Sequence, residues 1–389
     1  MTFKDRGAGV SRQVGVTESV DRRDALIDFQ GIISDFHSDK PAAPQEVTAV
    51  LNRQPGVPCY AMGRNEDSLA LTEHVEILGV VDDFGAPGEK WRGLPVISSC
   101  ELPPGACVVN CSTSISPVSA DRRIRSVPGV SCVMLADLYR LSGSPVAPPE
   151  FVREARAELS TREEQLRWIH SSLSDAESRR VFNDLMSYRL TGDYRFMESY
   201  VTRLSDQYFE PFLGALNDST FVDCGGFDGD TTEEFVRRYP QYRKVFLFEP
   251  SATNIDKAKA RLDRVRDIEF VPLGVSDHEE VLSFDSGSGS ACAVSEMGDS
   301  RIRLVSLDHY TDDCFSFVKM DLEGWESRAL KGAEHHIQND KPILAIAVYH
   351  HISDFWQIPE FVLSLHPDYK IYLRHYTEGW SESVMYFVP

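Results

Sequence analysis

The stretch FVDCGGFDGDTT, from Phe221 to Thr232, predicts the fold of the C-terminal half of the chain. An apolar run ends in an acid, a glycine-rich turn follows, and a pair of threonines opens a helix. This order predicts a strand, a tight loop and a helix N-terminus, which together bring backbone N–H groups close to a nucleotide-like ligand. Three glycines permit positive φ angles and close backbone approach, namely Gly225, Gly226 and Gly229.

Acids in this loop and after the next strand indicate what kind of ligand would bind. Asp223, Asp228 and Asp230 would repel a pyrophosphate but suit a ligand that carries positive charge. A second buried strand, Val245–Phe248, ends at Glu249, roughly 20 residues after the glycines, where an acid accepts hydrogen bonds from ribose hydroxyls. The alternative for Glu249 is a solvated loop acid.

Two later strand ends carry polar groups that could do chemistry. Asp321 and Glu323 follow a strand over Phe315–Met320, and on an extended chain both carboxylates would point the same way. They could bind a divalent cation, accept a substrate proton or orient a hydroxyl, while Glu323 could instead cap the next helix. His350 follows a strand over Ile343–Val348 and could be a general base, complete a metal site with the two acids, or only hydrogen-bond the backbone.

Other residues near strand ends allow two interpretations each. Val275 and Ser276 follow a strand over Ile268–Val271 and could flank an adenine or form a simple turn. Tyr349 and Trp356 could form a stacking wall for a sugar ring, and they are equally good core residues.

Four segments together resemble the FkbM-type methyltransferases, which use S-adenosylmethionine. They are Phe221–Thr232, Phe248–Pro250, Val318–Glu326 and Leu330–Ala333, and the resemblance covers about residues 207 to 389. It implies an α/β fold of the class I methyltransferase type, a seven-stranded, mainly parallel Rossmann-like sheet whose last two strands pair antiparallel at one edge. The general methyltransferase loop has a glycine at the position of Phe227, where FkbM-like loops often carry a bulky residue.

The resemblance implies an S-adenosylmethionine-dependent O-methyltransferase acting on a sugar, polyketide or other secondary-metabolite or polysaccharide hydroxyl. Asp321, Glu323 and His350 would be its catalytic residues. The cofactor-binding residues would be Asp223, Gly225, Gly226, Phe227, Gly229, Asp230, Thr231, Glu249, Pro250, Val275, Ser276 and Asp321. No residue is assigned to a metal, and a divalent cation such as Mg²⁺ is left open as a second cofactor.

Composition excludes several other classes of protein. The formal net charge of −20 over 389 residues argues against non-specific binding to nucleic acid or to an anionic membrane. No apolar run approaches the ~20 residues needed to span a bilayer, and Met1–Arg6 lacks a hydrophobic signal core. The eight cysteines contain no Cys-x-x-Cys pair, so zinc is not expected and reduced cytoplasmic thiols are the default. The expected partner is a small-molecule or glycan acceptor, and a homo-oligomer is left open.

The chain is long enough for two domains. We expect a tail and helix over 1–44, a small α/β Rossmann-like domain over 45–145, a helical connector over 146–215, and the methyltransferase domain over 216–389. The first helix is predicted over Asp21–His37.

The expected N-terminal α/β domain resembles, loosely, the nucleotide-sugar-type Rossmann domains. Its first loop, Ala61–Glu66, has one glycine where a dinucleotide fingerprint needs three, although Asp82 could meet a ribose. The domain is therefore interpreted either as a nucleotide site or as a structural or partner-binding unit.

An insertion over Val281–Leu307 is predicted to form two short strands around a Gly/Ser-rich loop, Ser286–Ser290, either a mobile loop near the substrate or a surface hairpin. Two rival functions are kept: a scaffold protein of a biosynthetic cluster with degenerate nucleotide sites, and a nicotinamide oxidoreductase that uses the N-terminal sheet.

Overall fold

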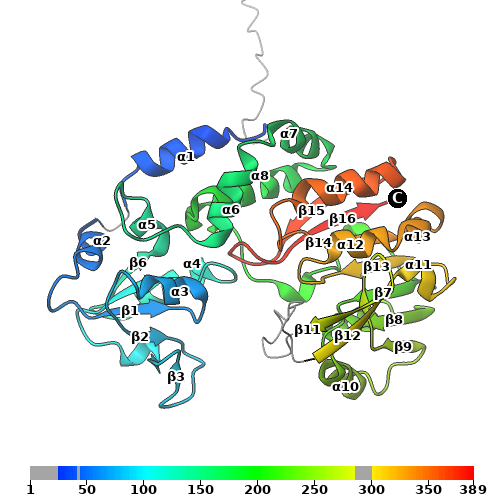
Figure 1. Ribbon diagram of the computed structural model, residues 1–389, viewed down its shortest axis with the longest axis horizontal. Helices are drawn as coiled ribbons and strands as arrows, with labels where there is room; N and C mark the ends of the chain where they lie inside the picture. Colours follow the sequence, from blue (N-terminus) through cyan, green and yellow to red (C-terminus); the bar gives the residue numbers. More distant parts are fainter. Residues whose placement is uncertain (1–24, 42–43, 285–299) are drawn as a thin grey trace, which may run out of the picture.

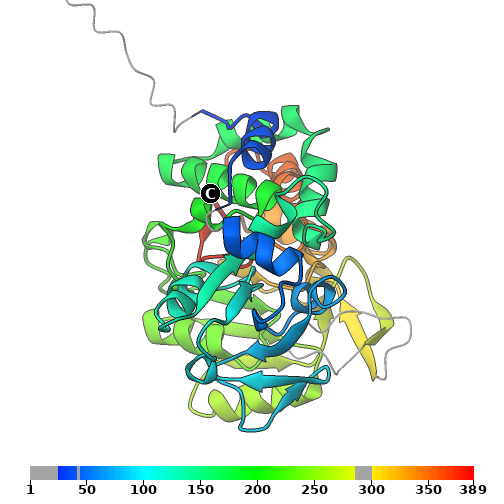
Figure 2. The ribbon, with the colours of Figure 1, turned by 90° about the vertical axis from the view of Figure 1, so that its left-hand side faces the viewer.

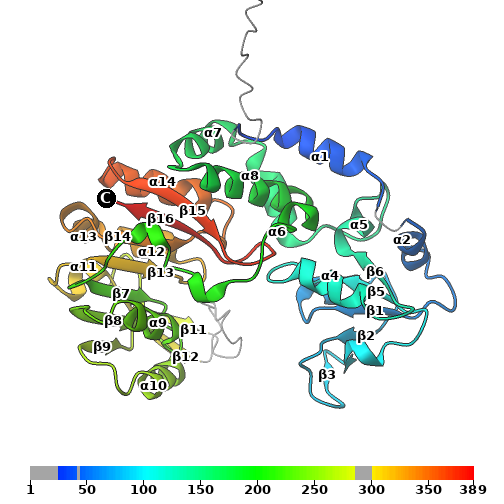
Figure 3. The ribbon, with the colours of Figure 1, turned by 180° about the vertical axis from the view of Figure 1, so that it is seen from behind.

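The structure, a computed structural model, describes residues 25–41, 44–284 and 300–389 (Figure 1). A six-stranded sheet lies at one end of the molecule and a seven-stranded sheet at the other, and α1, α6, α7 and α8 lie along the side that joins them (Figures 1 and 3). In Figure 2 the N-terminal sheet faces the viewer, with the C-terminal one behind it. None of the helices that the structure describes combines the length and apolar composition needed to cross a bilayer.

The N-terminal sheet has the strand order β3-β4-β2-β1-β5-β6 and is parallel except for β3, which pairs antiparallel with β4. Its strands are β1 Cys59–Met62, β2 Ile77–Val81, β3 Lys90–Trp91, β4 Leu94–Ile97, β5 Cys107–Asn110 and β6 Ser131–Met134. The helices here are α2 Pro44–Leu51, α3 Glu66–Leu71, the 3-10 turn η1 Ser99–Glu101, α4 Pro117–Arg125 and α5 Leu135–Tyr139. The expected parallel α/β arrangement is confirmed, while β3 was not predicted.

Asp82, considered above as a ribose ligand, already has a partner in the structure. Its carboxylate lies 2.7 Å from Nε of Arg64, and the same guanidinium binds Glu89 at 2.6 Å. Arg64 stands in the first loop, where a dinucleotide fingerprint would have glycine.

The first helix, α1 Phe29–Ser38, is shorter than predicted because Asp28 accepts a hydrogen bond from the Gly31 N–H and caps the helix there. Residues 21–24 of the predicted span lie outside the described residues. The connector consists of α6 Glu150–Leu159, α7 Glu163–Ser172 and α8 Ala176–Thr191, followed by the 3-10 turns η2 Tyr194–Met197, η3 Leu204–Asp206 and η4 Pro211–Leu213.

The connector helices pack directly on the C-terminal sheet. One cluster of buried side chains contains Phe182 and Leu185 of α8 together with Leu344 and Phe355 from the C-terminal part. Full burial of side chains of this size stabilises by roughly 1.5–3 kcal/mol each. The connector therefore shares a hydrophobic core with the sheet that carries the site.

The C-terminal sheet has the order β15-β16-β14-β13-β7-β8-β9 and consists of β7 Thr220–Cys224, β8 Lys244–Phe248, β9 Ile268–Val271, β13 Phe317–Met320, β14 Ile343–Ala347, β15 Lys370–His375 and β16 Ser383–Val388. All seven predicted strands are present, and β15 and β16 pair antiparallel at the edge, as expected. Strands β7 and β13 are parallel neighbours, although β8 and β9 follow β7 on its other side. The strand order thus reverses between β7 and β13, which is where open α/β sheets bind ligands.

Around this sheet lie α9 Asp230–Arg238, α10 Ala252–Arg261, α11 Leu307–Tyr310, α12 Glu326–Lys331, α13 Glu334–Asn339 and α14 Asp354–Leu365. A small sheet of order β10-β12-β11 is built from β10 Gly274–Val275, β11 Glu280–Phe284 and β12 Ser300–Val305. The last two are the predicted strands of the insertion, and the loop Ser286–Ser290 between them lies outside the described residues.

The turn between β15 and β16 contacts the N-terminal part. The Glu378 carboxylate accepts hydrogen bonds from N and Oγ of Ser119 at 2.7 and 2.6 Å. A Cβ on Gly379 would lie 2.2 Å from the carbonyl oxygen of Ser114, so only glycine permits this approach. The loop before α4 and the first turn of α4 are therefore fixed to the turn between β15 and β16.

Candidate active site

A cavity of about 690 Å³ opens at the carboxyl ends of β7 and β13, where the strand order reverses. Its volume falls in the usual range for small-molecule sites. The predicted site residues that line it are Gly225, Phe227, Asp230, Thr231, Glu249, Pro250, Val275, Asp321 and Glu323. The cavity therefore gathers residues from four strand ends that are up to a hundred positions apart.

The glycine loop is shaped by one close backbone contact. Gly225 has φ +79°, and a Cβ there would lie 2.0 Å from the carbonyl oxygen of Asp321. The N–H groups of Gly225 and Gly226 both donate to the carbonyl of Phe248, at 3.0 and 2.9 Å. Phe227 also has a positive φ, +45°, which is uncommon for a bulky residue, and this residue, 37% exposed, lines the cavity.

Gly226 and Gly229 do not line the cavity, which differs from the prediction. A Cβ on Gly226 would meet Leu247 at 2.4 Å, and one on Gly229 would meet Leu262 at 2.8 Å. Gly229 has φ +86° and stands at the N-cap of α9. Gly226 lets the loop pack on Leu247 of β8, and Gly229 lets the start of α9 pack on the end of α10. Their influence on a ligand is therefore indirect.

Asp223 is likewise placed below the cavity and not in its wall. Its side chain is fully buried, its Oδ1 lies 3.1 Å from Nζ of Lys319, and its Oδ2 accepts a hydrogen bond from Thr232. The predicted direct contact between Asp223 and a cationic ligand group is replaced by this internal ion pair.

Lys319 is a site residue that the sequence reasoning missed. Its ammonium lines the cavity, donates to the carbonyl of Gly225 at 2.7 Å and so links β13 to the glycine loop. Burial alone would lower the pKa of Lys319, but the carboxylates of Asp223 and Asp321 raise it, so the side chain is charged. The available signal was a lysine within an otherwise apolar strand, since a buried lysine needs a partner.

Glu249 is buried at the end of β8 and faces the cavity. It accepts hydrogen bonds from the backbone N–H of Phe227 at 3.2 Å and of Ser251 at 2.8 Å, and its pKa is raised because burial disfavours the charge. These two donors fix the carboxylate where it can accept further hydrogen bonds from the cavity. The solvated-acid interpretation of Glu249 does not describe this environment.

Two other expectations are corrected. Ser276 is fully buried, with its hydroxyl donating to Asp277 at 3.1 Å, and only its neighbour Val275 reaches the cavity. Trp356 is buried in α14 and does not line the cavity, whereas Tyr349 does.

Asp321 and Glu323 both reach the cavity, but by a turn and not by an extended strand. Glu323 has φ +53°, in the left-handed region. Glu323 does not cap the next helix either. Helix α12 has no side-chain cap, and the carboxylate of Glu326 in its first turn accepts a hydrogen bond from the N–H of Leu322, in the preceding turn, at 2.6 Å.

His350 lies among three carboxylates. Its Nδ1 is 3.0 Å from Glu326, and its Nε2 is 3.4 Å from Glu323 and 3.7 Å from Asp321. Burial alone would lower the pKa of His350, but these acids outweigh it and raise the pKa to about 11. The imidazole therefore carries its proton at neutral pH, which is not the state that a general base requires.

Further polar groups surround Asp321 that the sequence did not reveal. The Tyr208 hydroxyl donates to Oδ2 of Asp321 at 2.8 Å, and the Tyr349 hydroxyl donates to Oδ1 at 3.3 Å. Glu382, whose pKa is raised to about 7 by burial and by Asp321, accepts a hydrogen bond from Gln207 at 2.7 Å. Tyr208 and Gln207 lie before β7, in a segment of irregular structure that carries no recognisable sequence motif. Sequence reasoning therefore had no signal by which to find them.

The sequence model of the Methyltransferase FkbM domain matches residues 223–377, which contain most of this cavity's wall. The crystal structure of methyltransferase FkbM from Methylobacillus flagellatus KT is similar, with a TM-score of 0.69 at 23% identity over 92% of this chain and 98% of that chain. This likeness shows that the two chains share a fold over nearly their whole length.

More distant structures include an rRNA methylase from Streptococcus thermophilus, with a TM-score of 0.32 at 18% identity over 45% of this chain and 89% of that one. Fibrillarin from Aeropyrum pernix, in complex with natively bound S-adenosyl-L-methionine, has a TM-score of 0.31 at 10% identity over 48% of this chain and 71% of that one. No curated protein matches the chain. The domain match bears out the cofactor expected from the sequence, S-adenosylmethionine, and the chain is a methyltransferase that carries an FkbM methyltransferase domain.

Proposed function

We propose that the enzyme transfers the methyl group of S-adenosylmethionine to a hydroxyl of a sugar, polyketide or related secondary-metabolite or polysaccharide acceptor. The observation that carries this proposal is the position of Asp321 and Glu323. Both carboxylates line the same cavity as the glycine loop and Glu249. Groups able to receive a hydroxyl proton thus lie next to groups able to bind a nucleoside.

The glycine-loop side of the cavity suits the cofactor. Glu249, held by the N–H groups of Phe227 and Ser251, would accept hydrogen bonds from the two ribose hydroxyls. Val275 and Pro250 would pack against the adenine. Lys319, the cationic residue among the described residues of the cavity wall, would meet the carboxylate of the methionine part.

The charge of the cavity favours a cationic cofactor and an acceptor without negative charge. Its lining acids are Asp230, Glu234, Glu249, Asp321, Glu323 and Glu382. S-adenosylmethionine brings a sulfonium and an ammonium group to this surface, whereas a phosphorylated or carboxylated acceptor would be repelled. A neutral polyhydroxylated acceptor fits this environment.

The reaction requires alignment and the removal of one proton. The acceptor oxygen attacks the methyl carbon, the C–S bond breaks with its electron pair going to sulfur, and S-adenosylhomocysteine is formed. Asp321, whose two oxygens accept from Tyr208 and Tyr349, is fixed and would orient the acceptor hydroxyl. Glu323, more exposed and without such hydroxyl partners among the described residues, would take the proton.

His350 has a different role in this proposal from the general base expected from the sequence. As a cation between Glu323 and Asp321, it would hold both carboxylates in position.

The test uses the full chain with isotopically labelled S-adenosylmethionine and extracts of candidate producer cells, analysed by mass spectrometry. We expect a labelled, O-methylated small molecule, and S-adenosylhomocysteine binding measurable by calorimetry. Asp321→Asn should reduce labelling by at least about 100-fold with S-adenosylhomocysteine affinity within about threefold of the parent, because it removes the charged acceptor that would orient the hydroxyl and keeps the shape.

Unchanged labelling by Asp321→Asn would remove that residue from the mechanism, and label found in RNA or on nitrogen would overturn the acceptor class. Absence of S-adenosylhomocysteine binding would instead favour the scaffold hypothesis.

A further inference from the structure

We propose that Asp321, Glu326 and His350 form a binding site for one divalent cation, best matched to Mn²⁺, next to the part of the cavity wall that Asp321 forms. Its role in the reaction rests on the proposed function, whereas binding of the cation does not. Asp321 lines the cavity, and Glu326 and His350 are its neighbours in this cluster and do not line the cavity.

The three side chains have the spacing of metal ligands. Each offers one donor atom, and these atoms all lie within 4.8 Å of one another. Bonds of about 2.1 Å to a common ion place neighbouring donors roughly 3 to 4 Å apart, so only small side-chain movements are needed. The residues come from the end of β13, the first turn of α12 and the end of β14, and the packed sheet positions all three.

Glu326 provides an independent indication of a ligand. Its side chain is 1% exposed, yet its Oε2 has no hydrogen-bond partner among the residues that the structure describes. Its Oε1 accepts from the N–H of Leu322 and lies 3.0 Å from His350. A buried carboxylate oxygen left without a partner is strongly disfavoured, and a cation in this cluster would satisfy it.

The charges of the cluster leave an excess of acid. Asp321, Glu323 and Glu326 surround one imidazole, so even a protonated His350 leaves two negative charges uncompensated. Lys319 also interacts with Asp321, but its single charge is already matched by that of Asp223, 3.1 Å away. A divalent cation would neutralise the charges of Asp321 and Glu326 and would displace the proton of His350, because an imidazole binds a metal in its neutral form.

The donor set indicates which cation fits. Mg²⁺ prefers oxygen ligands and retains several waters, whereas imidazole suits transition metals. A site of two carboxylates and one imidazole therefore favours Mn²⁺ or a related transition metal over Mg²⁺. Bound there, the cation would lower the pKa of an acceptor hydroxyl that coordinates it, and Glu323 would receive the released proton.

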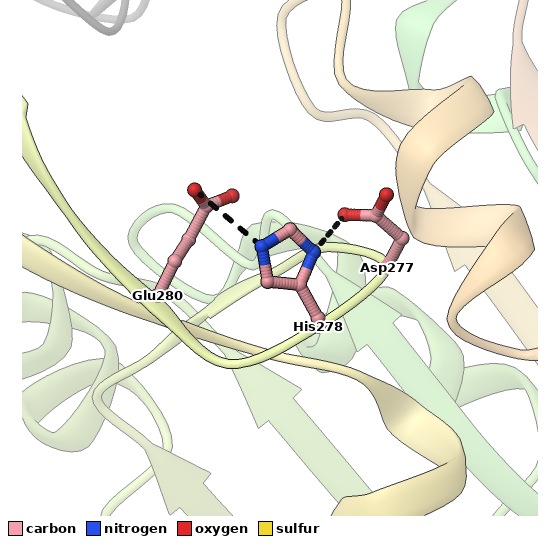
Figure 4. A group of neighbouring side chains, drawn as sticks. All are labelled: Asp277, His278 and Glu280. Carbon is pink, nitrogen blue, oxygen red and sulfur yellow. Dashed lines mark hydrogen bonds and ion pairs between the residues drawn. The ribbon is translucent and has the colours of Figure 1, made fainter.

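A second cluster with the same residue types serves as a control. Asp277, His278 and Glu280 also lie within reach of a common ion, and Figure 4 shows the imidazole between the two carboxylates. There, however, Arg328 binds both acids at 2.6 Å, and the His278 side chain is 61% exposed. The guanidinium already compensates these acids, so this cluster is expected to bind a divalent cation weakly at most.

The experiment titrates MnCl₂ into the chelator-treated full chain and follows binding by calorimetry and by the electron paramagnetic resonance signal of free Mn²⁺. We expect one tight site per chain, with Mg²⁺ binding at least 10-fold more weakly. Glu326→Gln and His350→Gln should each weaken Mn²⁺ binding at least 10-fold. The matched variants Glu280→Gln and His278→Gln should change it by less than about twofold.

S-adenosylhomocysteine affinity, measured on the same samples, reports on folding and separates this inference from the proposed function. If Glu326→Gln no longer binds S-adenosylhomocysteine, the variant is not folded correctly, and the cation site is then tested with His350→Gln. A parent protein that binds S-adenosylhomocysteine but not Mn²⁺ overturns the cation site and leaves the methyltransferase proposal standing. Loss of Mn²⁺ binding in the control variants, or preference for Mg²⁺, also overturns it.

Discussion

Replacing Gly225 with alanine tests how the glycine loop and the end of β13 fit together. Two effects add at this position. The backbone has φ +79°, which alanine adopts at a cost of about 1–2 kcal/mol. The new Cβ would also lie 2.0 Å from the carbonyl oxygen of Asp321, a backbone atom that cannot rotate away.

The free-energy cost of the close contact between the new Cβ and Asp321 can be estimated from the distance. An ordinary contact needs about 3.4 Å or more, so the loop and the Asp321 turn must separate by more than an ångström. Forced overpacking of this kind costs typically about 1–3 kcal/mol, which brings the total to roughly 2–5 kcal/mol. Because the same displacement moves both walls of the cavity, S-adenosylhomocysteine affinity should fall at least about 10-fold.

Gly143→Ala is the matched control. Gly143 has nearly the same φ, +78°, but a Cβ there has nothing within 4 Å. It should lose only the backbone contribution, about 1–2 kcal/mol. Urea unfolding of the three proteins and calorimetry with S-adenosylhomocysteine measure the two effects. If Gly225→Ala is no less stable than Gly143→Ala and binds the nucleoside equally well, the proposed fit between loop and turn is refuted.

Three further predictions address the cofactor site, the core and the contact between the halves. Glu249→Gln should weaken S-adenosylhomocysteine binding about 10-fold in calorimetry, since hydrogen bonds to a charged group are worth ~1.5–3 kcal/mol, and equal affinity would exclude the ribose role. Burial lowers the pKa of His375 to about 3, below its ordinary 6.5, so the unfolded state binds the proton first as pH falls. The contribution of His375 to stability should fall by about 2 kcal/mol from neutral pH to pH 5, measured as the difference between the parent and His375→Asn in a denaturation series, and equal pH slopes for the two proteins would contradict this. Glu378→Ala should destabilise the chain by about 1–3 kcal/mol in thermal or urea unfolding because it leaves the N–H and hydroxyl of Ser119 without their charged acceptor, and an unchanged midpoint would show that the contact is not needed.

The sequence alone determined the strands and the candidate side chains at their ends. Apolar runs followed directly by acids or glycine mark strand ends, and parallel strands place all these ends on one edge, so Glu249, Asp321 and Gly225 were found without a structure. Local pattern could not, however, separate residues that face the cavity from residues that face the core. Ser276 and Gly226 stand in loops that border the cavity, but Ser276 is buried and Gly226 faces Leu247 of β8.

Only the tertiary structure decided the protonation of His350 and the partners of Asp321. A pKa depends on distances between charges from different elements, and Glu326 becomes a neighbour of His350 only when α12 packs beside α14, the helix that follows His350. Tyr208 reaches Asp321 from 113 positions away through chain that carries no motif. Such contacts follow from the packing of the whole sheet and helices, which no stretch of the sequence records by itself.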